Sequence, residues 1–210
     1  NSGYYIFREI ELFTFIRCGR YKDRPSHADN LHVDVWWQGQ NILLDGGSYK
    51  YNASPEDVKY FSGTASHNTV MLEDHDQMLK GPRFIWLNWS RALEASVEEN
   101  EGEFCFAGSV SCFTCLNKKI VHKRVVRKKK GELEWRITDE IVNKPTGLEL
   151  RQLWHTRPGM LVVETGEGGK VREEEGEYSS LYGMKEKSVQ YCCVTSDNRI
   201  QTIISIVNKK

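Results

Sequence analysis

The feature that most constrains the fold of this chain is a succession of short strand-like segments with no long helical pattern. These segments are rich in β-branched and aromatic residues and are separated by Gly, Asn, Asp or Pro, which end strands. About ten of them without long helices predict an all-β fold, an antiparallel multi-stranded β-sandwich or barrel. The segments are IELFTFIRCG, LHVDVWWQG, QNILLDGG, HNTVMLED, RALEASVEE, EFCFAGSVSCFTC, the hairpin HKRVVRKKKGELEWRITDEIV, LELRQLWHTRP, SVQYCCVTS and IQTIISIVN.

Three other segments carry weaker signals. In SPEDVKYFSG, Ser54 precedes Pro55 and two acidic residues, which predicts a helix of one or two turns, and no helix longer than about three turns is expected elsewhere. The charged segment 166–180 is interpreted as a mobile loop or a long hairpin, and the basic run 127–130 as a solvated turn. No linker is visible, so residues 1–210 are expected to form a single β-sandwich domain.

Length and charge exclude some classes of function. A chain of 210 residues can bury a substantial core, and its formal net charge of zero gives no electrostatic case for binding nucleic acid. No apolar run approaches the roughly 18 residues that span a bilayer, and no signal peptide is visible. Because the chain opens at Asn1 without a methionine, we expect it to be a piece of a longer protein.

Ionisable residues are concentrated just before and within one predicted strand. His27, Asp29, His32 and Asp34 occupy eight positions, and Asp45 follows the next strand. In LHVDVWW, alternation places Leu31, Val33, Val35 and Trp37 on one face and His32, Asp34 and Trp36 on the other. His32 and Asp34 are therefore expected to form an exposed polar strand face.

Three polar segments lie at predicted strand ends and can converge on one site. They are His27-Ala28-Asp29, the turn Asp45-Gly46-Gly47-Ser48, and Ser66-His67-Asn68-Thr69. Imidazole nitrogens and a carboxylate oxygen are ligands that a divalent cation takes, with a position left open. The alternative is that these side chains hydrogen-bond to one another without a metal.

Several motifs together resemble a known family. GYYIFRE, SHADNLHVDVWW, LLDGGSYKY and YFSGTASHNTV, followed by VHKRVV, WRITDEI and LWHTRP, occur in the order seen in the C-terminal β-sandwich domain of the heparinase II/III-like family, from about Gly3 to Pro158. The resemblance implies a polysaccharide lyase with an N-terminal α/α toroid ahead of the sandwich and the active site between them. It implies β-elimination on an anionic, uronate-containing glycan such as heparin or heparan sulfate, and a periplasmic or secreted location.

The resemblance also implies roles for individual residues. In some members a His-x-His-x-Asp pattern, a later Asp and the His of HNT supply a zinc site, and the matching ligands here are His27, Asp45 and His67, with Asp29 as the trailing Asp. Two imidazoles and one carboxylate suit zinc better than calcium or magnesium. The catalytic first His of the pattern is replaced by Pro25, so His27 is the candidate that takes over part of the catalytic role.

Further expectations follow from this assignment. Tyr49, Tyr51 and Asn68, close to the expected ligands, are predicted to contact substrate. His67→Ala should abolish metal binding and His32→Ala should leave it nearly intact. A separation above about 8 Å between the ligand side chains, well beyond twice a ligand bond length, would exclude a shared site.

Three functional hypotheses remain open at this stage. The first is the sandwich domain of a polysaccharide lyase whose base or acid lies partly in the absent toroid, so that this fragment alone is inactive. The second is a metal-stabilised, non-catalytic sandwich that binds glycans or serves a structural role, which Pro25 would permit. The third is a zinc-dependent hydrolase that uses a metal-bound water.

Overall fold

The computed structural model describes residues 3–207, and within them sixteen strands and two short helices form the fold. The helices are α1 (Pro55–Ser62) and the 3-10 turn η1 (Thr64–Ser66). The strands are β1 (Tyr4–Arg8), β2 (Leu12–Arg17), β3 (Val33–Trp37), β4 (Gln40–Leu43), β5 (Val70–Leu72), β6 (Leu79–Lys80), β7 (Trp86–Leu87), β8 (Arg91–Glu99), β9 (Glu103–Ser111), β10 (Val121–Lys129), β11 (Glu134–Val142), β12 (Leu150–Thr156), β13 (Leu161–Thr165), β14 (Lys170–Tyr178), β15 (Glu186–Thr195) and β16 (Arg199–Ile206).

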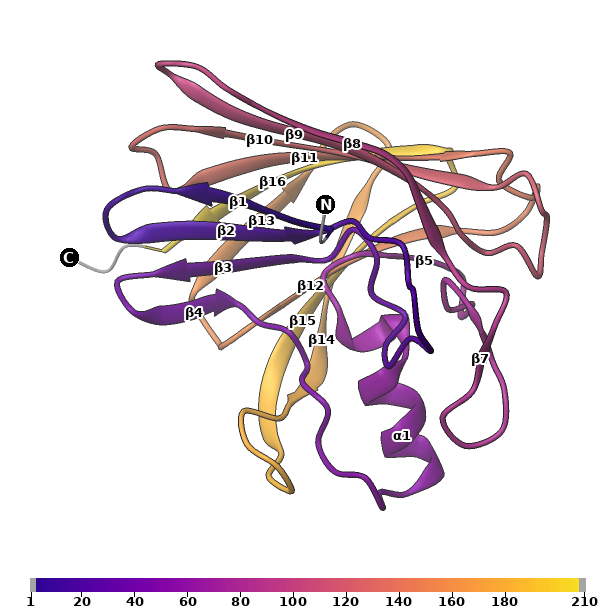
Figure 1. Ribbon diagram of the computed structural model, residues 1–210. Coiled ribbons are helices and arrows are strands. Elements are labelled where there is room, and N and C mark those ends of the chain that lie inside the picture. The colour runs from indigo at the N-terminus through magenta and orange to yellow at the C-terminus, as the bar shows by residue number, and fades with distance from the viewer. Residues whose placement is uncertain (1–2, 208–210) are drawn as a thin grey trace.

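The strands form four sheets, and their neighbours pair antiparallel. The largest has the order β13-β16-β11-β10-β9-β8, and the others have the orders β1-β2-β3-β4, β14-β15-β12-β5 and β6-β7. Figure 1 shows the six-stranded sheet as the upper layer, with β1–β4 beneath it and β12, β14 and β15 continuing the lower layer. The predicted β-sandwich is confirmed.

Alternation explains how the layers hold together. In β9 and β10 every second residue is buried, as expected for strands with one face on the core. One continuous hydrophobic cluster joins side chains of both layers, including Ile16 and Val33 from the lower layer and Phe106, Trp135 and Ile137 from the upper. Burial of each such side chain contributes about 1.5–3 kcal/mol of transfer free energy.

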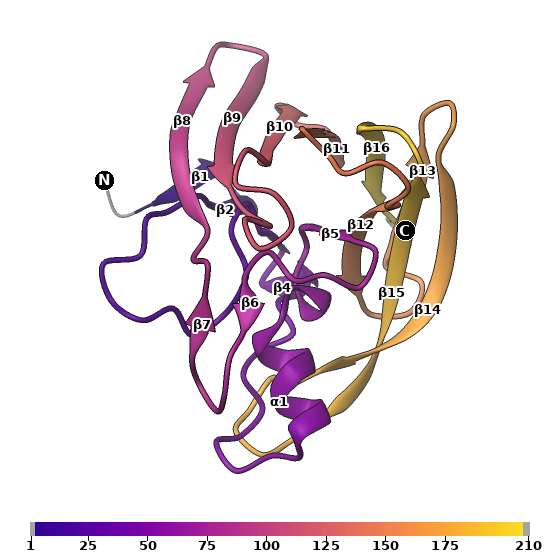
Figure 2. The ribbon, with the colours of Figure 1, turned by 90° about the vertical axis from the view of Figure 1, so that its right-hand side faces the viewer.

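The helix predicted at Ser54 is present. The Ser54 hydroxyl accepts a hydrogen bond from the Asp57 backbone N–H, Pro55 opens the helix, and α1 ends after eight residues. Figure 2 shows α1 outside the sandwich, between the β6-β7 hairpin and strands β14 and β15. In the part of the chain that the structure describes, no helix has the length and apolar character needed to cross a bilayer.

One charged segment matches an alternative of its prediction and another differs from it. Residues 170–178 form strand β14, which pairs antiparallel with β15 along nine residues, so the long hairpin is confirmed and the mobile loop is not. Strand β14 lies at the edge of its sheet, where charged residues discourage pairing with other chains. In the basic run, Lys128 is buried and ion-paired with Glu9 instead of being solvated.

The predicted polar face of β3 is wrong for His32. His32 is buried because the Asn68 backbone and the Asp45 carboxylate cover its side of the strand, whereas Leu31 is in the core as predicted. Asp34 is half-buried and accepts a hydrogen bond of 2.7 Å from Asn41 Nδ2. Burial, and then the nearby charge of Asp45, raises the pKa of Asp34 to about 7.

A buried ion pair ties the upper layer to the loops of the lower one. Both Asp139 oxygens accept hydrogen bonds from Arg124, and they also accept from His122 Nε2 and Gln152 Nε2. The remaining Arg124 nitrogen, Nη1, donates to the carbonyl oxygens of Leu31 and Asn68, at 2.6 and 2.7 Å. The upper sheet therefore fixes the backbone at two polar segments of the lower layer.

We predict that Asp139→Asn lowers the free energy of unfolding by about 3–5 kcal/mol. All four contacts of the carboxylate are donors, so an amide nitrogen would face two of them and leave Arg124 unneutralised. Urea unfolding measures the change. The matched control is Asp74→Asn, whose side chain is 92% exposed beside Arg151 and should change stability by no more than about 0.5 kcal/mol. Equal effects of the two substitutions would contradict the prediction.

We also predict that Asp34→Asn stabilises the protein above neutral pH. Between the pKa of Asp34 in the unfolded chain and its raised value of about 7 in the folded state, the folded state holds a proton that the unfolded state releases. Wild-type stability therefore falls as the pH rises across that window, whereas the amide cannot titrate. After allowance for partial exposure we expect a gain of about 1–3 kcal/mol at pH 8 and none near pH 4. A difference that does not change with pH would contradict it.

Candidate functional site

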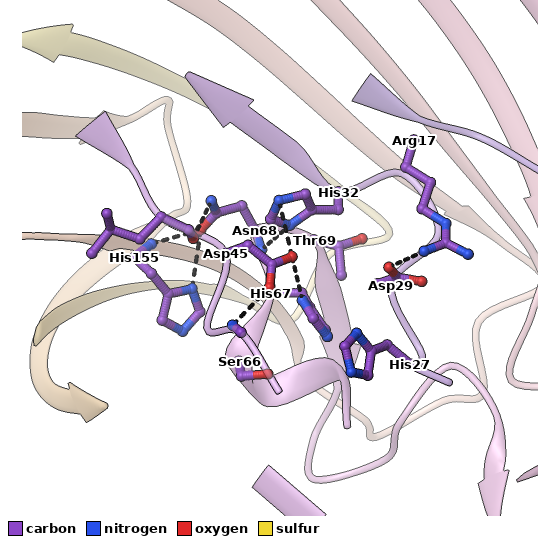
Figure 3. Close-up of polar contacts among 12 residues, drawn as sticks. Arg17, His27, Asp29, His32, Asp45, Ser66, His67, Asn68, Thr69 and His155 are labelled. Atoms are coloured by element: carbon purple, nitrogen blue, oxygen red, sulfur yellow. Dashed lines mark hydrogen bonds and ion pairs between the residues drawn. The ribbon is translucent and has the colours of Figure 1, made fainter. Parts of the chain in front are cut away.

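The three polar segments singled out in the sequence converge at one end of the lower layer. Figure 3 shows His32, at the start of β3, with Asp45, which follows β4, and His67, which lies between η1 and β5. Each of the three has one atom that could bind a metal ion, and these atoms lie within 4.8 Å of one another. The convergence was predicted, but His32 occupies the place expected for His27.

Asp45 lies at the centre of this cluster, and the glycines beside it hold its carboxylate. The Gly47 backbone N–H donates to Oδ1 at 2.8 Å, which turns Oδ2 toward the imidazoles. Gly47 has a φ of +80°, and a Cβ there would lie 2.3 Å from the Ser179 carbonyl oxygen. Burial alone would raise the pKa of Asp45, but the His67 imidazole beside it holds that pKa well below its usual range.

His67 is fully buried and is oriented by Asp45. Its Nδ1 lies 3.0 Å from Asp45 Oδ2, and its Nε2 is buried without a hydrogen-bond partner. Burial lowers the pKa of His67, but the Asp45 carboxylate more than offsets this, and the net direction is upward. An imidazole with one nitrogen on a carboxylate and the other without a partner has a lone pair available to a ligand.

His32 has a different hydrogen-bonding pattern. Its Nδ1 accepts the backbone N–H of Asn68 at 2.9 Å. Its Nε2 lies 3.5 Å from Asp45 Oδ2, too far for a hydrogen bond, and is buried without another partner. Burial lowers the pKa of His32 to about 4, so the ring is neutral at physiological pH.

His27, the predicted ligand and catalytic residue, lies at the edge of the cluster. It is half-buried, its Nε2 is 3.2 Å from Ser48 Oγ, and its ring centroid is 5.2 Å from that of His67. The two rings are thus close enough for a shared ion, although His27 is not in the tight group of three. Burial, and then the proximity of His67, lowers the pKa of His27.

Two other residues of these segments have internal roles. The Asn68 amide nitrogen donates to the carbonyl oxygens of Val33 and Leu44, and its side-chain oxygen accepts the His155 backbone N–H. Because Asn68 is fully buried and its amide is used in this way, it has no free group for the predicted substrate contact. Asp29 is buried and ion-paired with Arg17, apart from the cluster.

A cavity of about 360 Å³ opens beside His27. His27, Pro25 and Ser48 line one part of it, and α1 lines another. Tyr51 belongs to the lining, stacked on Phe84 with ring centroids 4.6 Å apart, whereas Tyr49 packs against Phe61 behind the wall. Besides His27, its cationic and aromatic lining residues are Arg24, Lys50, Lys80, Tyr51, Phe61, Phe84 and Tyr182.

The donor atoms suit a small divalent cation at Asp45 and His67. Around a tetrahedral zinc ion with bonds of about 2.0–2.2 Å, adjacent ligands lie about 3.3–3.6 Å apart. The separation of 3.0 Å between Asp45 Oδ2 and His67 Nδ1 is slightly shorter than that spacing, so these two residues lie close enough to share an ion. The unpartnered, buried nitrogen of His67 is a second indication that a ligand belongs in this cluster.

Two residues of this region were missed in the sequence. His32 was assigned to an exposed surface because alternation does not show that the segments of Asp45 and Asn68 cover this face of the strand. Arg124, which holds the carbonyls of Leu31 and Asn68, lies in a strand of alternating basic residues and gave no local signal. A buried arginine is visible only once its partners, from distant parts of the chain, are known.

Comparison with known proteins bears on the fold and the family. The structure is similar to that of a heparinase III, with 20% sequence identity and a TM-score of 0.79 over 100% of this chain and 35% of that one. It is also similar to the heparan sulfate lyase HepC from Pedobacter heparinus, with 18% identity and a TM-score of 0.77 over 98% of this chain and 35% of that one.

These likenesses show a shared fold, and the chain spans about a third of the length of each of those proteins. No curated protein sequence matches the chain. The family model described as heparinase II/III-like, C-terminal, matches residues 1–207. The chain therefore belongs to the heparinase II/III-like C-terminal domain family.

Proposed function

We propose that this domain forms the sandwich part of a polysaccharide lyase that cleaves uronate-containing, anionic glycans by β-elimination. The observation that carries the proposal is the cavity in which His27 lies beside cationic and aromatic side chains. Family membership supports the reaction class, and a toroid N-terminal to this domain in the same chain is proposed as the other wall of the active site.

The charge of the cavity suits an anionic sugar. Arg24, Lys50 and Lys80 line it, and the single lining carboxylate, Asp57, is neutralised by Lys185 at 2.7 Å. Excess positive charge in a concave site attracts carboxylate or sulfate groups. Tyr51 and Phe84, stacked on one another, offer an apolar wall against which a sugar ring can pack.

β-Elimination makes three demands on such a site. The proton at C5 beside an ionised carboxylate is a weak acid, so that carboxylate must be neutralised, a base must take the proton, and an acid must protonate the leaving oxygen. Lys50 and Lys80, which line the cavity, are proposed to neutralise the carboxylate. His27, whose pKa is lowered by burial, is the residue of this domain proposed to accept or return a proton, a role open to it while it is not bound to the cation.

We propose that a divalent cation, most plausibly zinc, binds to Asp45, His67 and His27. When bound, it would supply a positive charge that polarises oxygen ligands and would tie three strand-end segments together. The two imidazoles and the carboxylate favour zinc over calcium or magnesium. Cation and cavity adjoin through His27, which contacts the His67 ring on one side and lines the cavity on the other.

A second candidate function is a sandwich that binds glycans or stabilises its neighbour without catalysis. The observation that favours it is Pro25, which is buried in the cavity wall where the family pattern has a catalytic histidine. Proline has no titratable group, so any proton transfer at that position must come from elsewhere. Release of unsaturated uronate by the full-length protein separates the two functions.

We predict that Lys50→Met together with Lys80→Met lowers kcat/KM of the full-length protein on heparan sulfate by about 10- to 30-fold. Each lysine is expected to contribute about 1 kcal/mol to holding an anionic group, and 1.4 kcal/mol corresponds to tenfold. The ultraviolet absorbance of the unsaturated product measures the rate. Lys187→Met, with a side chain 88% exposed on β15 and outside the cavity, should leave the rate unchanged. An unaltered rate in the double variant would argue against this cavity.

We predict further that residues 1–210 alone release no unsaturated uronate from any uronate glycan, whereas the full-length protein does. The reason is that the proposed acid or base partner lies in the toroid, while Pro25 removes a titratable group from this domain. Parallel assays of both proteins at equal concentration test this. Product from residues 1–210 alone would show that the domain contains a complete active site.

A further inference from the structure

His32 is the third imidazole of the cluster, and its hydrogen bonds determine what it can do there. Its Nδ1 faces the Asn68 backbone N–H at 2.9 Å. A backbone N–H can only donate, so Nδ1 must carry a lone pair and no proton. The single proton of the neutral ring is therefore on Nε2, the nitrogen that faces Asp45.

The Asn68 backbone enforces this tautomer of His32 and is itself held in place. The Asn68 N–H is buried and has His32 Nδ1 as its acceptor, so moving the proton to Nδ1 would set two donors against each other. The Asn68 backbone is itself held, because its carbonyl oxygen accepts from Arg124 and its amide group bridges Val33 and Leu44. The donor therefore cannot move away from the ring without disrupting those contacts.

A ring nitrogen that carries a proton has no lone pair for a metal ion. Binding of an ion to His32 Nε2 would require removal of that proton to give an imidazolate, or loss of the bond from Asn68. His67 differs, because its Nε2 has no hydrogen-bond partner and its Nδ1 faces a carboxylate. His27 differs too, because its Nε2 faces only the Ser48 hydroxyl, which can donate or accept and can move.

We infer that His32 is a positioning residue, which stands outside the coordination shell with its proton fixed on Nε2 and directs the Asp45 carboxylate toward the ion. The inference rests on the proposed cation site and assigns to it a residue that does not bind the ion. The Gly47 N–H holds Oδ1 by a hydrogen bond, and the protonated Nε2 of His32 faces Oδ2 at 3.5 Å, an electrostatic contact longer than a hydrogen bond. Groups that orient a ligand in this way commonly change metal affinity by about 10- to 100-fold.

The first test is zinc affinity of the full-length protein, measured by competition with a chromophoric chelator. His67→Ala and His27→Ala, which remove proposed ligands, should abolish stoichiometric binding. His32→Ala should retain one ion per chain with affinity lowered about 10- to 100-fold. His32→Gln places an amide donor near the position of Nε2 and should recover most of that loss, although an amide is a poor zinc ligand. Loss of binding in His32→Gln equal to that in His67→Ala would overturn the inference.

The second test reads the tautomer directly and does not depend on metal. Solid-state ¹⁵N spectra of histidine-labelled full-length protein are recorded for wild type and His32→Gln, and the signals lost in the variant belong to His32. We expect a protonated Nε2 and an unprotonated, hydrogen-bonded Nδ1, with or without zinc. A protonated Nδ1, or an Nε2 that becomes metal-bound on addition of zinc, would overturn the inference.

The two tests separate failure of the inference from failure of the proposed site. If wild-type protein binds no zinc, the cation site is wrong, and the spectrum still decides whether His32 has the inferred tautomer. Thermal unfolding of each variant shows whether the fold is retained. If His32→Ala does not fold, the zinc affinity of His32→Gln and the ¹⁵N spectrum of the wild type still test the inference.

Discussion

The buried contact between Arg124 and Asp139 is the interaction on which the site most depends. It neutralises two charges inside the sandwich, and its remaining donors fix the backbone carbonyls of Leu31 and Asn68. These residues immediately precede His32 and follow His67. A salt bridge in a core is often no more stabilising than a pair of apolar side chains. Here the salt bridge serves to position the two loops that carry the imidazoles, because it connects them to the upper sheet.

The site is built mainly from backbone geometry. Gly47 adopts a conformation that brings its N–H onto Asp45, and the Asn68 N–H determines which nitrogen of His32 carries the proton. Side chains then add charge to this framework: Asp45 raises the pKa of His67, while burial lowers the pKa of His32. The pKa values of two histidines in one cluster are thereby shifted in opposite directions, and such shifts let a protein give different roles to residues of the same type.

The extent to which the sequence predicted the fold depended on how local each signal was. The long strands β9 to β11 and the cap of α1 at Ser54 were predicted, because alternation and capping are local patterns. Strand β14 was predicted only as one of two alternatives, a long hairpin or a mobile loop, because an edge strand covered by charged residues lacks the apolar periodicity on which strand prediction relies.

The candidate site was predicted in part for the same reason. Its three segments were found because His, Asp and Gly cluster at strand ends, and they do converge in the structure. The burial of His32 could not be foreseen, since it depends on the segments of Asp45 and Asn68, which come from elsewhere in the chain and cover it. The partners of Arg124 lie 56 and 93 residues away in sequence, and no local pattern records such contacts.

The turn between β14 and β15 is hydrogen-bonded to the segment that follows Asp45. The Ser179 N–H donates to the Gly46 carbonyl oxygen, the Gly183 N–H donates to the Tyr49 carbonyl oxygen, and the Tyr182 hydroxyl accepts the Tyr51 N–H. The first of these contacts borders the histidine cluster, whereas the other two border the cavity. Insertions or deletions beyond Gly183 can therefore reshape the cavity wall while the imidazoles stay in register. The proposed glycan contacts can thus diverge without a change at the proposed cation site, and this turn is the segment in which such divergence can accumulate.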